Sequence, residues 1–201
     1  LNECDTAKNP FFKVMLSLSS HEPFEVPMDP VFKGQDESSK FLNACFYTDK
    51  SLGEFIREAK KKSWWNNTLI IITADHGHRF PNPNELKEKD RFKIPMLWLG
   101  GAISKQDTTI QTFGIQTDIS NTLLNQVGVH VNEFTFSKNL MADDVNSFAL
   151  YIFNNGFGYV APHDENIFDF DLQNYLKKEG DEKQLPLGKA YPVSYTHLRA
   201  H

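Results

Sequence analysis

The sequence lacks most of the features that assign a protein to a class directly. Its 201 residues include two cysteines, Cys4 and Cys45, and neither lies in a CxxC pair or another metal-binding spacing. Apolar runs such as 69–72 are much too short to span a bilayer, and no signal peptide opens the chain. The 21 basic residues are outnumbered by 26 acidic ones, so nothing predicts a basic surface for nucleic acid. The roles of the two cysteines stay open.

Two common phosphate-binding and catalytic loops are absent as well. The chain has no glycine-rich phosphate loop and no GxSxG sequence, so nucleotide binding and serine-hydrolase chemistry have no support. Aromatic residues are plentiful: 17 Phe, 6 Tyr and 3 Trp are too many for a disordered chain. The length suits one domain, or most of a larger one, with a real hydrophobic core.

Short apolar segments alternate with amphipathic ones, which predicts an α/β fold. We expect a layered, parallel-rich sheet with flanking helices, followed by a small C-terminal antiparallel meander. The expected buried strands of the first part are 11–18, 68–73 and 92–99, and the expected helices are 38–62 and 117–127. The expected meander strands are 148–154, 157–161 and 167–170, with Asn155-Gly156 as the first turn.

Two of the predicted strands end in loops that carry histidine. His21 follows the first strand, and Asp75 and His76 follow the second. Ligand sites of parallel sheets gather beyond the carboxyl ends of the strands, so one rim can hold all three residues. A carboxylate oxygen and a neutral imidazole suit a divalent metal, and Gly77 permits the backbone turn that both ligands need. On spacing alone, the alternative is that Asp75 forms a turn or cap.

The next two residues extend this polar cluster. His78 is either a further ligand, or a group that supports the ligands, or a solvated loop residue. Arg79 either meets an anionic substrate group or forms a surface ion pair.

Five segments occur in an order that is more specific than any one of them. They are SSHEPF at 19–24, YTDKSLG at 47–53, NTLIIITADHGH at 67–78, IPMLWLG at 94–100, and QTDI with TLL within 116–124. In this order the chain resembles the second half of a sulfatase-fold domain over nearly all of residues 10–175. Within that fold it most resembles the lipoteichoic acid synthase-like, phosphoglycerol transferase branch of the alkaline phosphatase superfamily.

The resemblance implies roles for single residues. Asp75 and His76 become ligands of a divalent metal, most often Mn, with Mg, Zn or Ca as alternatives. His21 becomes a contact to the substrate phosphate or glycerol, while His78 and Arg79 match no ligand position. Asp49 and Asp118 fall in motifs that support the fold. The branch uses a Thr as its nucleophile, and that Thr would lie upstream of residue 1. A metal-binding Glu and the membrane helices would lie upstream as well, so we expect this chain by itself to be inactive.

The function implied by the resemblance is metal-dependent phosphoryl transfer. A phosphoglycerol transferase or phosphodiesterase would act on a phospholipid headgroup or an envelope glycan, on the extracytoplasmic face of the cell membrane and without a nucleic-acid partner. The alternatives are a sulfatase acting on glycans, which uses a modified Cys in a Cys-x-Pro-x-Arg context, and a catalytically silent extracytoplasmic binding domain.

The predicted organisation has four parts. We expect the C-terminal part of a sulfatase-like catalytic domain at 1–140, a small antiparallel subdomain of the same fold at 141–180, and a tail at 181–192. The segment at 193–201, VSYTHLRAH, resembles the translation of a transposase-end adapter used in DNA sequencing libraries.

Overall fold

The computed structural model describes residues 1–8, 10–82, 85, 87–104, 107–130 and 133–180. They form two compact units. The N-terminal unit comprises Leu1–Glu85 and Lys93–Gln106, and the C-terminal unit comprises Leu86–Phe92 and Asp107–His201. The tail at 181–192 and the adapter-like segment at 193–201 lie outside the described residues, and the domain limits expected from the sequence stay predictions.

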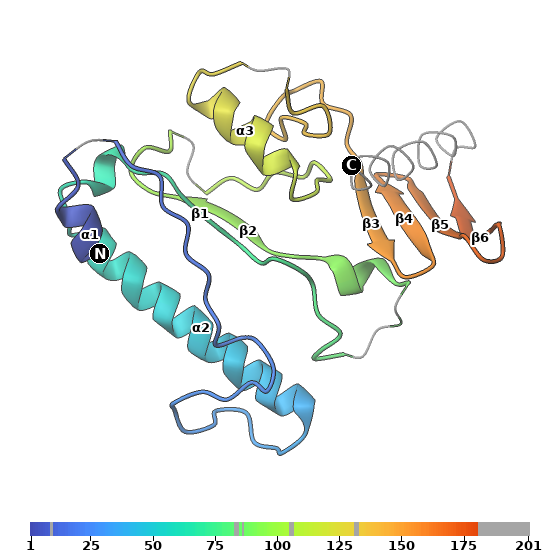
Figure 1. Cartoon of the computed structure of the whole chain (residues 1–201), viewed down its shortest axis with the longest axis horizontal. Coiled ribbons are helices and arrows are strands. Elements are labelled where there is room, and N and C mark those ends of the chain that lie inside the picture. The colour runs from blue at the N-terminus through green and yellow to red at the C-terminus, as the bar shows by residue number, and fades with distance from the viewer. Residues whose placement is uncertain (9, 83–84, 86, 105–106, 131–132, 181–201) are drawn as a thin grey trace. The chain divides into compact units, whose positions relative to one another are not determined.

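The N-terminal unit is built around one long helix and a pair of strands (Figure 1). Its elements are α1 (Asn2–Asp5), α2 (Glu37–Ala59), β1 (Ile70–Thr73) and β2 (Met96–Leu99). The Asp36 side chain caps α2 by accepting a hydrogen bond from the Ser39 N–H at 3.0 Å. The helix ends just before a run of three lysines at 60–62, whose charge suits the negative end of a helix dipole. The predicted helix at 38–62 is therefore confirmed.

The strands β1 and β2 pair antiparallel, with Ile70 opposite Leu99 and Thr73 opposite Met96. The α/β class is confirmed, but the one sheet described in this unit is antiparallel rather than parallel. A parallel neighbour needs a crossover connection, usually through a helix. In the described residues between β1 and β2 there is only a short 3₁₀ turn, Lys89–Phe92, and the chain returns in the opposite direction.

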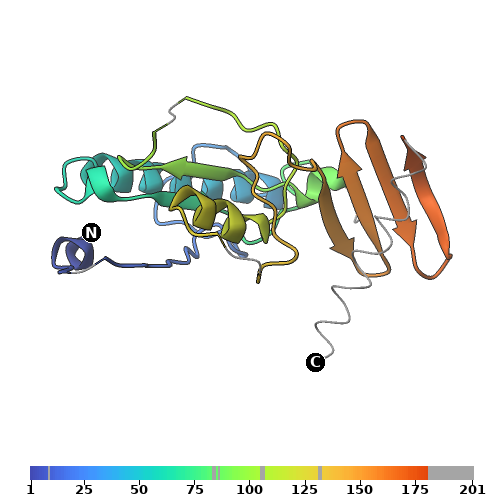
Figure 2. The same cartoon turned by 90° about the horizontal axis from the view of Figure 1, so that it is seen from above.

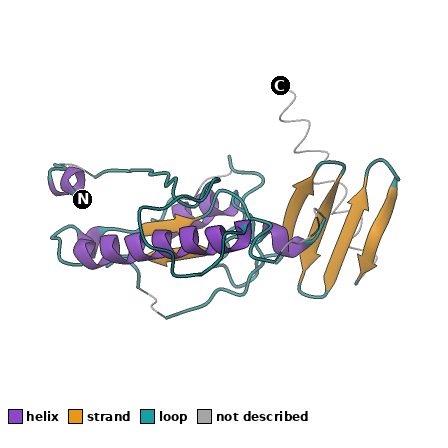
Figure 3. Ribbon diagram, turned by 90° about the horizontal axis from the view of Figure 1, so that it is seen from below, coloured by secondary structure: helices purple, strands orange, loops and turns teal. Residues whose placement is uncertain are grey.

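The predicted buried strand at 11–18 is wrong for this structure. The segment runs as a loop (Figure 3), and its apolar side chains are exposed, Phe12 by 83% and Leu16 by 87%. A strand is stabilised by its hydrogen-bonded neighbours, and no ladder among the described residues includes this segment. The segment is apolar as expected, but no described segment pairs with it and buries it.

The connection that follows is tied to α2 by one buried amide. The Asn43 Oδ1 accepts hydrogen bonds from the N–H groups of Val31 and Phe32, at 2.8 and 2.9 Å. Its Nδ2 donates to the carbonyl oxygens of Phe32 and Ser39, both at 2.9 Å. All the hydrogen-bonding capacity of a buried polar group is thereby used, which fixes this loop on the helix.

The described residues of the C-terminal unit form one α-helix and a four-stranded antiparallel meander (Figures 2 and 3). Its elements are α3 (Asp118–Gln126), β3 (Ala149–Phe153), β4 (Gly156–Ala161), β5 (Asp164–Asp169) and β6 (Asn174–Glu179). The predicted antiparallel meander and the predicted helix at 117–127 are confirmed. The strand β6 was not predicted, because its sequence NYLKKE is mostly polar. In the structure most of its residues are exposed.

One face of the meander is packed by Tyr151. A Cβ added to Gly158 would lie 1.9 Å from Cζ of this ring, so only glycine leaves room for it. Phe92 stacks on Tyr151 with ring centroids 4.5 Å apart, and the Tyr151 hydroxyl donates to the Lys87 carbonyl at 2.8 Å. Burial raises the pKa of Tyr151 well above its usual range.

A charged cluster lies beside this ring, on β5. The Glu165 carboxylate pairs with the ammonium groups of Lys89 and Lys177, the second at 3.0 Å. Burial acts to raise the pKa of Glu165, but the hydrogen bonds and charges of the two lysines outweigh it, and the pKa lies below its ordinary value.

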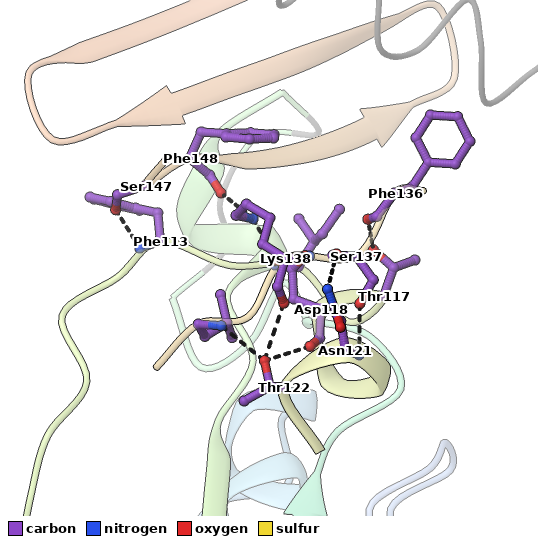
Figure 4. Close-up of polar contacts among 12 residues, drawn as sticks. Phe113, Thr117, Asp118, Asn121, Thr122, Phe136, Ser137, Lys138, Ser147 and Phe148 are labelled. Atoms are coloured by element: carbon purple, nitrogen blue, oxygen red, sulfur yellow. Dashed lines mark hydrogen bonds and ion pairs between the residues drawn. The ribbon is translucent and has the colours of Figure 1, made fainter. Parts of the chain in front are cut away.

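Asp118, at the start of α3, is fully buried and holds that helix to the segment before the meander (Figure 4). Its carboxylate accepts hydrogen bonds from the N–H groups of Ile115 and Lys138, each at 2.8 Å. The Lys138 ammonium also donates to it, and then reaches the Phe148 carbonyl at 3.1 Å. In this structure Asp118 supports the fold.

Candidate functional site

Asp75 and His76 lie in the loop directly after β1, where the strand gives way to a bend. The His76 N–H donates to Asp75 Oδ1 at 3.0 Å, which turns the backbone so that the two side chains lie near each other. His76 Nε2 is 3.8 Å from Asp75 Oδ2. Both side chains are open to solvent, His76 by 67% and Asp75 by 78%.

One contact selects the tautomer of the neutral His76 ring, and this tautomer can bind a metal through Nε2. Its Nδ1 lies 2.8 Å from the Gly77 carbonyl oxygen, which can only accept, so Nδ1 carries the proton and Nε2 keeps its lone pair. At ligand distances of about 2.0–2.2 Å, two donors of a tetrahedral shell lie about 3.3–3.6 Å apart. The 3.8 Å between His76 Nε2 and Asp75 Oδ2 is slightly wider, so this exposed pair fits a divalent metal after a small approach of the two side chains.

Two donor atoms do not complete a metal site. Within the ranges that the structure describes, no set of three or more His, Cys, Asp or Glu side chains gathers as a possible site. The pair can supply half of a four-coordinate shell, and the remaining ligands would come from other groups.

His21 lies in a turn of the loop at 19–24 and is exposed. Its N–H donates to the Leu18 carbonyl at 3.0 Å, and its own carbonyl accepts from the Phe24 N–H at 2.9 Å. The ring Nδ1 donates to the Glu22 carbonyl at 2.8 Å, so Nε2 faces away from the backbone. The same tautomer is thus set in His21 as in His76.

The structure brings the loop of His21 against the loop of Asp75 and His76 through aromatic side chains. His78 stacks on Phe41 of α2, with centroids 4.8 Å apart and an interplanar angle of 16°. Phe24, from the first loop, meets the His78 ring edge-on at 5.5 Å. His78 Nε2 is also 3.8 Å from the Glu22 carboxylate. His78 is therefore partly buried, and it is not the solvated residue that the sequence left as one alternative.

Arg79 follows on the exposed side of this loop. Its guanidinium lies over the Phe80 ring, 4.8 Å from the centroid, a favourable cation–π contact. That contact holds the side chain at the surface beside the loop, and a role toward an anionic substrate group stays a prediction.

Sequence reasoning missed the aromatic residues that connect the two loops. Phe24, Phe41 and Phe80 surround His78, and Phe24 is 3% exposed. His78 and Phe80 are two positions apart, so the sequence is compatible with contact between their rings. The rings of Phe24 and Phe41 come from two other segments, and only the folded structure shows that they join the cluster. Two shallow pockets, of about 300 and 510 Å³, lie in the C-terminal unit, and neither is lined by a predicted site residue. No helix in the described ranges is both long and apolar enough to cross a bilayer.

Comparison with known proteins assigns this arrangement to a family. The family described as Sulfatase matches residues 2–129. The chain is 27% identical over 161 residues to the lipoteichoic acid synthase-like protein YvgJ of Bacillus subtilis (strain 168), covering 70% of this chain and 26% of that protein. It is 28% identical over 156 residues to the lipoteichoic acid synthase of Staphylococcus saprophyticus, covering 69% of this chain and 24% of that one. The chain thus spans about a quarter of the length of these relatives.

Solved structures agree with this assignment. A protein in the alkaline phosphatase superfamily from Vibrio parahaemolyticus superposes with a TM-score of 0.75 and 26% identity, covering 94% of this chain and 48% of that one. The lipoteichoic acid synthase LtaP from Listeria monocytogenes gives a TM-score of 0.56 at 20% identity, over 80% of this chain and 47% of that one, and supports the fold alone. The family resemblance predicted from the sequence is confirmed.

Proposed function

The chain belongs to the Sulfatase family, and from that premise we propose that it forms part of a metal-dependent phosphoglycerol transferase or phosphodiesterase. The observation that carries the proposal is the pair at the end of β1, where His76 Nε2 and Asp75 Oδ2 lie 3.8 Å apart. Relatives named as lipoteichoic acid synthases favour phosphoryl transfer within the family.

In this proposal the protein's own residues do three things. The Gly77 carbonyl accepts the Nδ1 proton of His76, so the neutral ring offers the lone pair of Nε2 to a metal. Asp75 supplies a negative oxygen beside it. His21, whose Nδ1 is bound to the Glu22 carbonyl, presents Nε2 to the substrate. When the ring carries a second proton, on Nε2, it can donate that proton to a departing glycerol oxygen and return to the neutral tautomer. A bound divalent ion, Mn in the first instance, would stabilise charge on the phosphoryl oxygens.

The substrate class that we propose is a glycerophosphodiester in the cell envelope, either a phospholipid headgroup or an envelope glycan. The relatives are named as a lipoteichoic acid synthase and a lipoteichoic acid synthase-like protein, which supports an envelope substrate. We accordingly propose that the domain works on the extracytoplasmic face of the cell membrane.

A second function is favoured by the family match itself, which is to sulfatases. Sulfate and phosphate esters present similar tetrahedral oxyanions, and Asp75, His76 and His21 suit both. Hydrolysis of sulfate esters of glycans is therefore the alternative that an experiment has to separate.

The test compares His76→Ala with His130→Ala in the full-length protein. His130 is a matched control, because it is also exposed and its ring Nδ1 lies 2.9 Å from the side-chain oxygen of Asn125, which is not a residue of the proposed site. We expect His76→Ala to weaken Mn²⁺ binding by calorimetry and to lower phosphoglycerol release from phosphatidylglycerol vesicles at least about 100-fold, since it removes a ligand itself. His130→Ala should change neither.

Three results would contradict the proposal in different ways. Undiminished turnover in His76→Ala would remove the metal assignment. Release of sulfate from a glycan sulfate, without release of phosphoglycerol, would establish the sulfatase alternative. Metal binding by the wild-type protein with turnover of neither substrate would identify a silent binding domain.

A further inference from the structure

We propose that His78 is a positioning residue that fixes the loop carrying His21 against the loop carrying Asp75 and His76. The structural part of this inference stands on contacts within the N-terminal unit alone. Its effect on turnover rests on the function proposed above, and the experiments below test the two parts separately.

The His78 ring is enclosed by rings from three segments. Phe41 of α2 stacks against one face at 4.8 Å, Phe24 of the 19–24 loop meets it edge-on at 5.5 Å with an interplanar angle of 87°, and Phe80 lies at 5.3 Å. Stacked and edge-to-face pairs are the favourable geometries for aromatic rings. With its side chain 24% exposed, His78 packs as the central ring of this cluster.

The nitrogen atoms fix the orientation of this ring. Nδ1 accepts a hydrogen bond from the Phe80 N–H at 3.1 Å, so it carries no proton and the neutral ring bears its proton on Nε2. Nε2 faces Glu22, whose carboxylate oxygen lies 3.8 Å away. One nitrogen thus holds its own loop, and the other faces the residue next to His21.

The backbone of the first loop depends on this packing. Phe24 has a φ of +61°, a left-handed conformation that is unfavourable for a bulky side chain. Its ring is 3% exposed and packs on Phe41, His78 and Phe80. Burial of the ring offsets the backbone strain, so removing His78 from the cluster weakens what holds Phe24 in place.

The position of His21 follows from Phe24. The Phe24 N–H donates to the His21 carbonyl at 2.9 Å, which closes the turn that presents the imidazole. A looser Phe24 therefore leaves His21 less well placed, so His78 acts on His21 through Phe24.

Hydrogen exchange in the full-length protein tests the structural part. We expect His78→Ala to speed exchange of the Phe24 amide about tenfold. The variant removes an aromatic contact to Phe24, so the turn that protects this amide opens at a lower free-energy cost. His78→Phe keeps a ring in the cluster, so it should leave the Phe24 amide protected while it speeds exchange of the Phe80 amide, which loses its acceptor. His130→Ala should change neither amide. Wild-type exchange at Phe24 in His78→Ala, or wild-type exchange at Phe80 in His78→Phe, overturns the inference.

A double-mutant cycle tests the functional part. We expect His78→Ala to lower kcat/KM for phosphoglycerol release about tenfold in the wild-type background and to have almost no effect in a His21→Ala background, because it acts through His21. Equal losses in both backgrounds would show that His78 does not act through His21. If the wild-type protein releases no phosphoglycerol, the proposed function fails, and the exchange experiment still decides the positioning role.

Discussion

Replacing Asp118 by Ala is the strongest test of how the C-terminal unit is held together. The side chain is 1% exposed, and it accepts hydrogen bonds from two backbone N–H groups and from the Lys138 ammonium. In the alanine variant all three donors lose their acceptor, and Lys138, only 12% exposed, is left as a buried charge without a carboxylate.

The size of the effect follows from that unpaired charge. Removing one partner of a buried ion pair costs about 3–5 kcal/mol, far more than the net worth of the pair. Lys138 retains the Phe148 carbonyl at 3.1 Å and the Phe148 ring at 4.3 Å, which places the expected loss toward the lower end of this range. Adding Lys138→Met to the Asp118→Ala variant should restore part of the stability, because no charge then remains buried.

Urea unfolding of the full-length protein, with hydrogen exchange read at the amides of α3, measures this loss. The control is Glu58→Ala, which breaks an exposed pair with Lys61 and should leave the exchange of α3 unchanged. A loss below about 1 kcal/mol for Asp118→Ala, or no recovery in the double variant, would refute the account of Asp118 as a buried anchor.

Two further predictions concern the meander. Because the folded-state pKa of Glu165 lies below its unfolded value, its stabilising effect is present above the unfolded pKa and is lost as the pH falls through the folded one. The difference in Tm between wild type and Glu165→Gln should therefore be largest at neutral pH and disappear in acid, and a difference that persists in acid would contradict this. Gly158→Ala should destabilise by about 1–3 kcal/mol in urea, since its Cβ would collide with the Tyr151 ring. A Cβ on Gly128 would meet no atom within 4 Å. Gly128→Ala should therefore lose only the stability that a φ of +75° costs an alanine, about 1–2 kcal/mol.

Local patterns predicted the elements whose stability is local. Helix α2 follows from its amphipathic spacing and its cap at Asp36, and β3 and β4 follow from the Asn155-Gly156 turn between them. The loop of Asp75 and His76 was also found, because an abrupt polar end to an apolar strand is visible in the sequence. Only the structure could show that Gly77 fixes the tautomer of His76.

What could not be predicted depends on contacts between distant segments. The segment 11–18 has the composition of a buried strand, yet in this structure it lacks a paired neighbour, and a neighbour cannot be read from its own residues. The strand β6 has almost no apolar pattern and exists because β5 offers it a hydrogen-bonding edge. The role of His78 depends on Phe24 and Phe41, which lie 54 and 37 positions away in the chain.

The order of the strands in the meander has a consequence for how it forms. Each of β3, β4, β5 and β6 pairs only with the strand before or after it in the sequence. The contacts therefore have low contact order, and each hairpin closes a short loop at small entropic cost. β1 and β2, by contrast, must find each other across the 22 residues between Thr73 and Met96. Hairpin by hairpin, the meander can assemble from its own residues early, while the pairing beside the candidate metal ligands waits for a much longer loop to close.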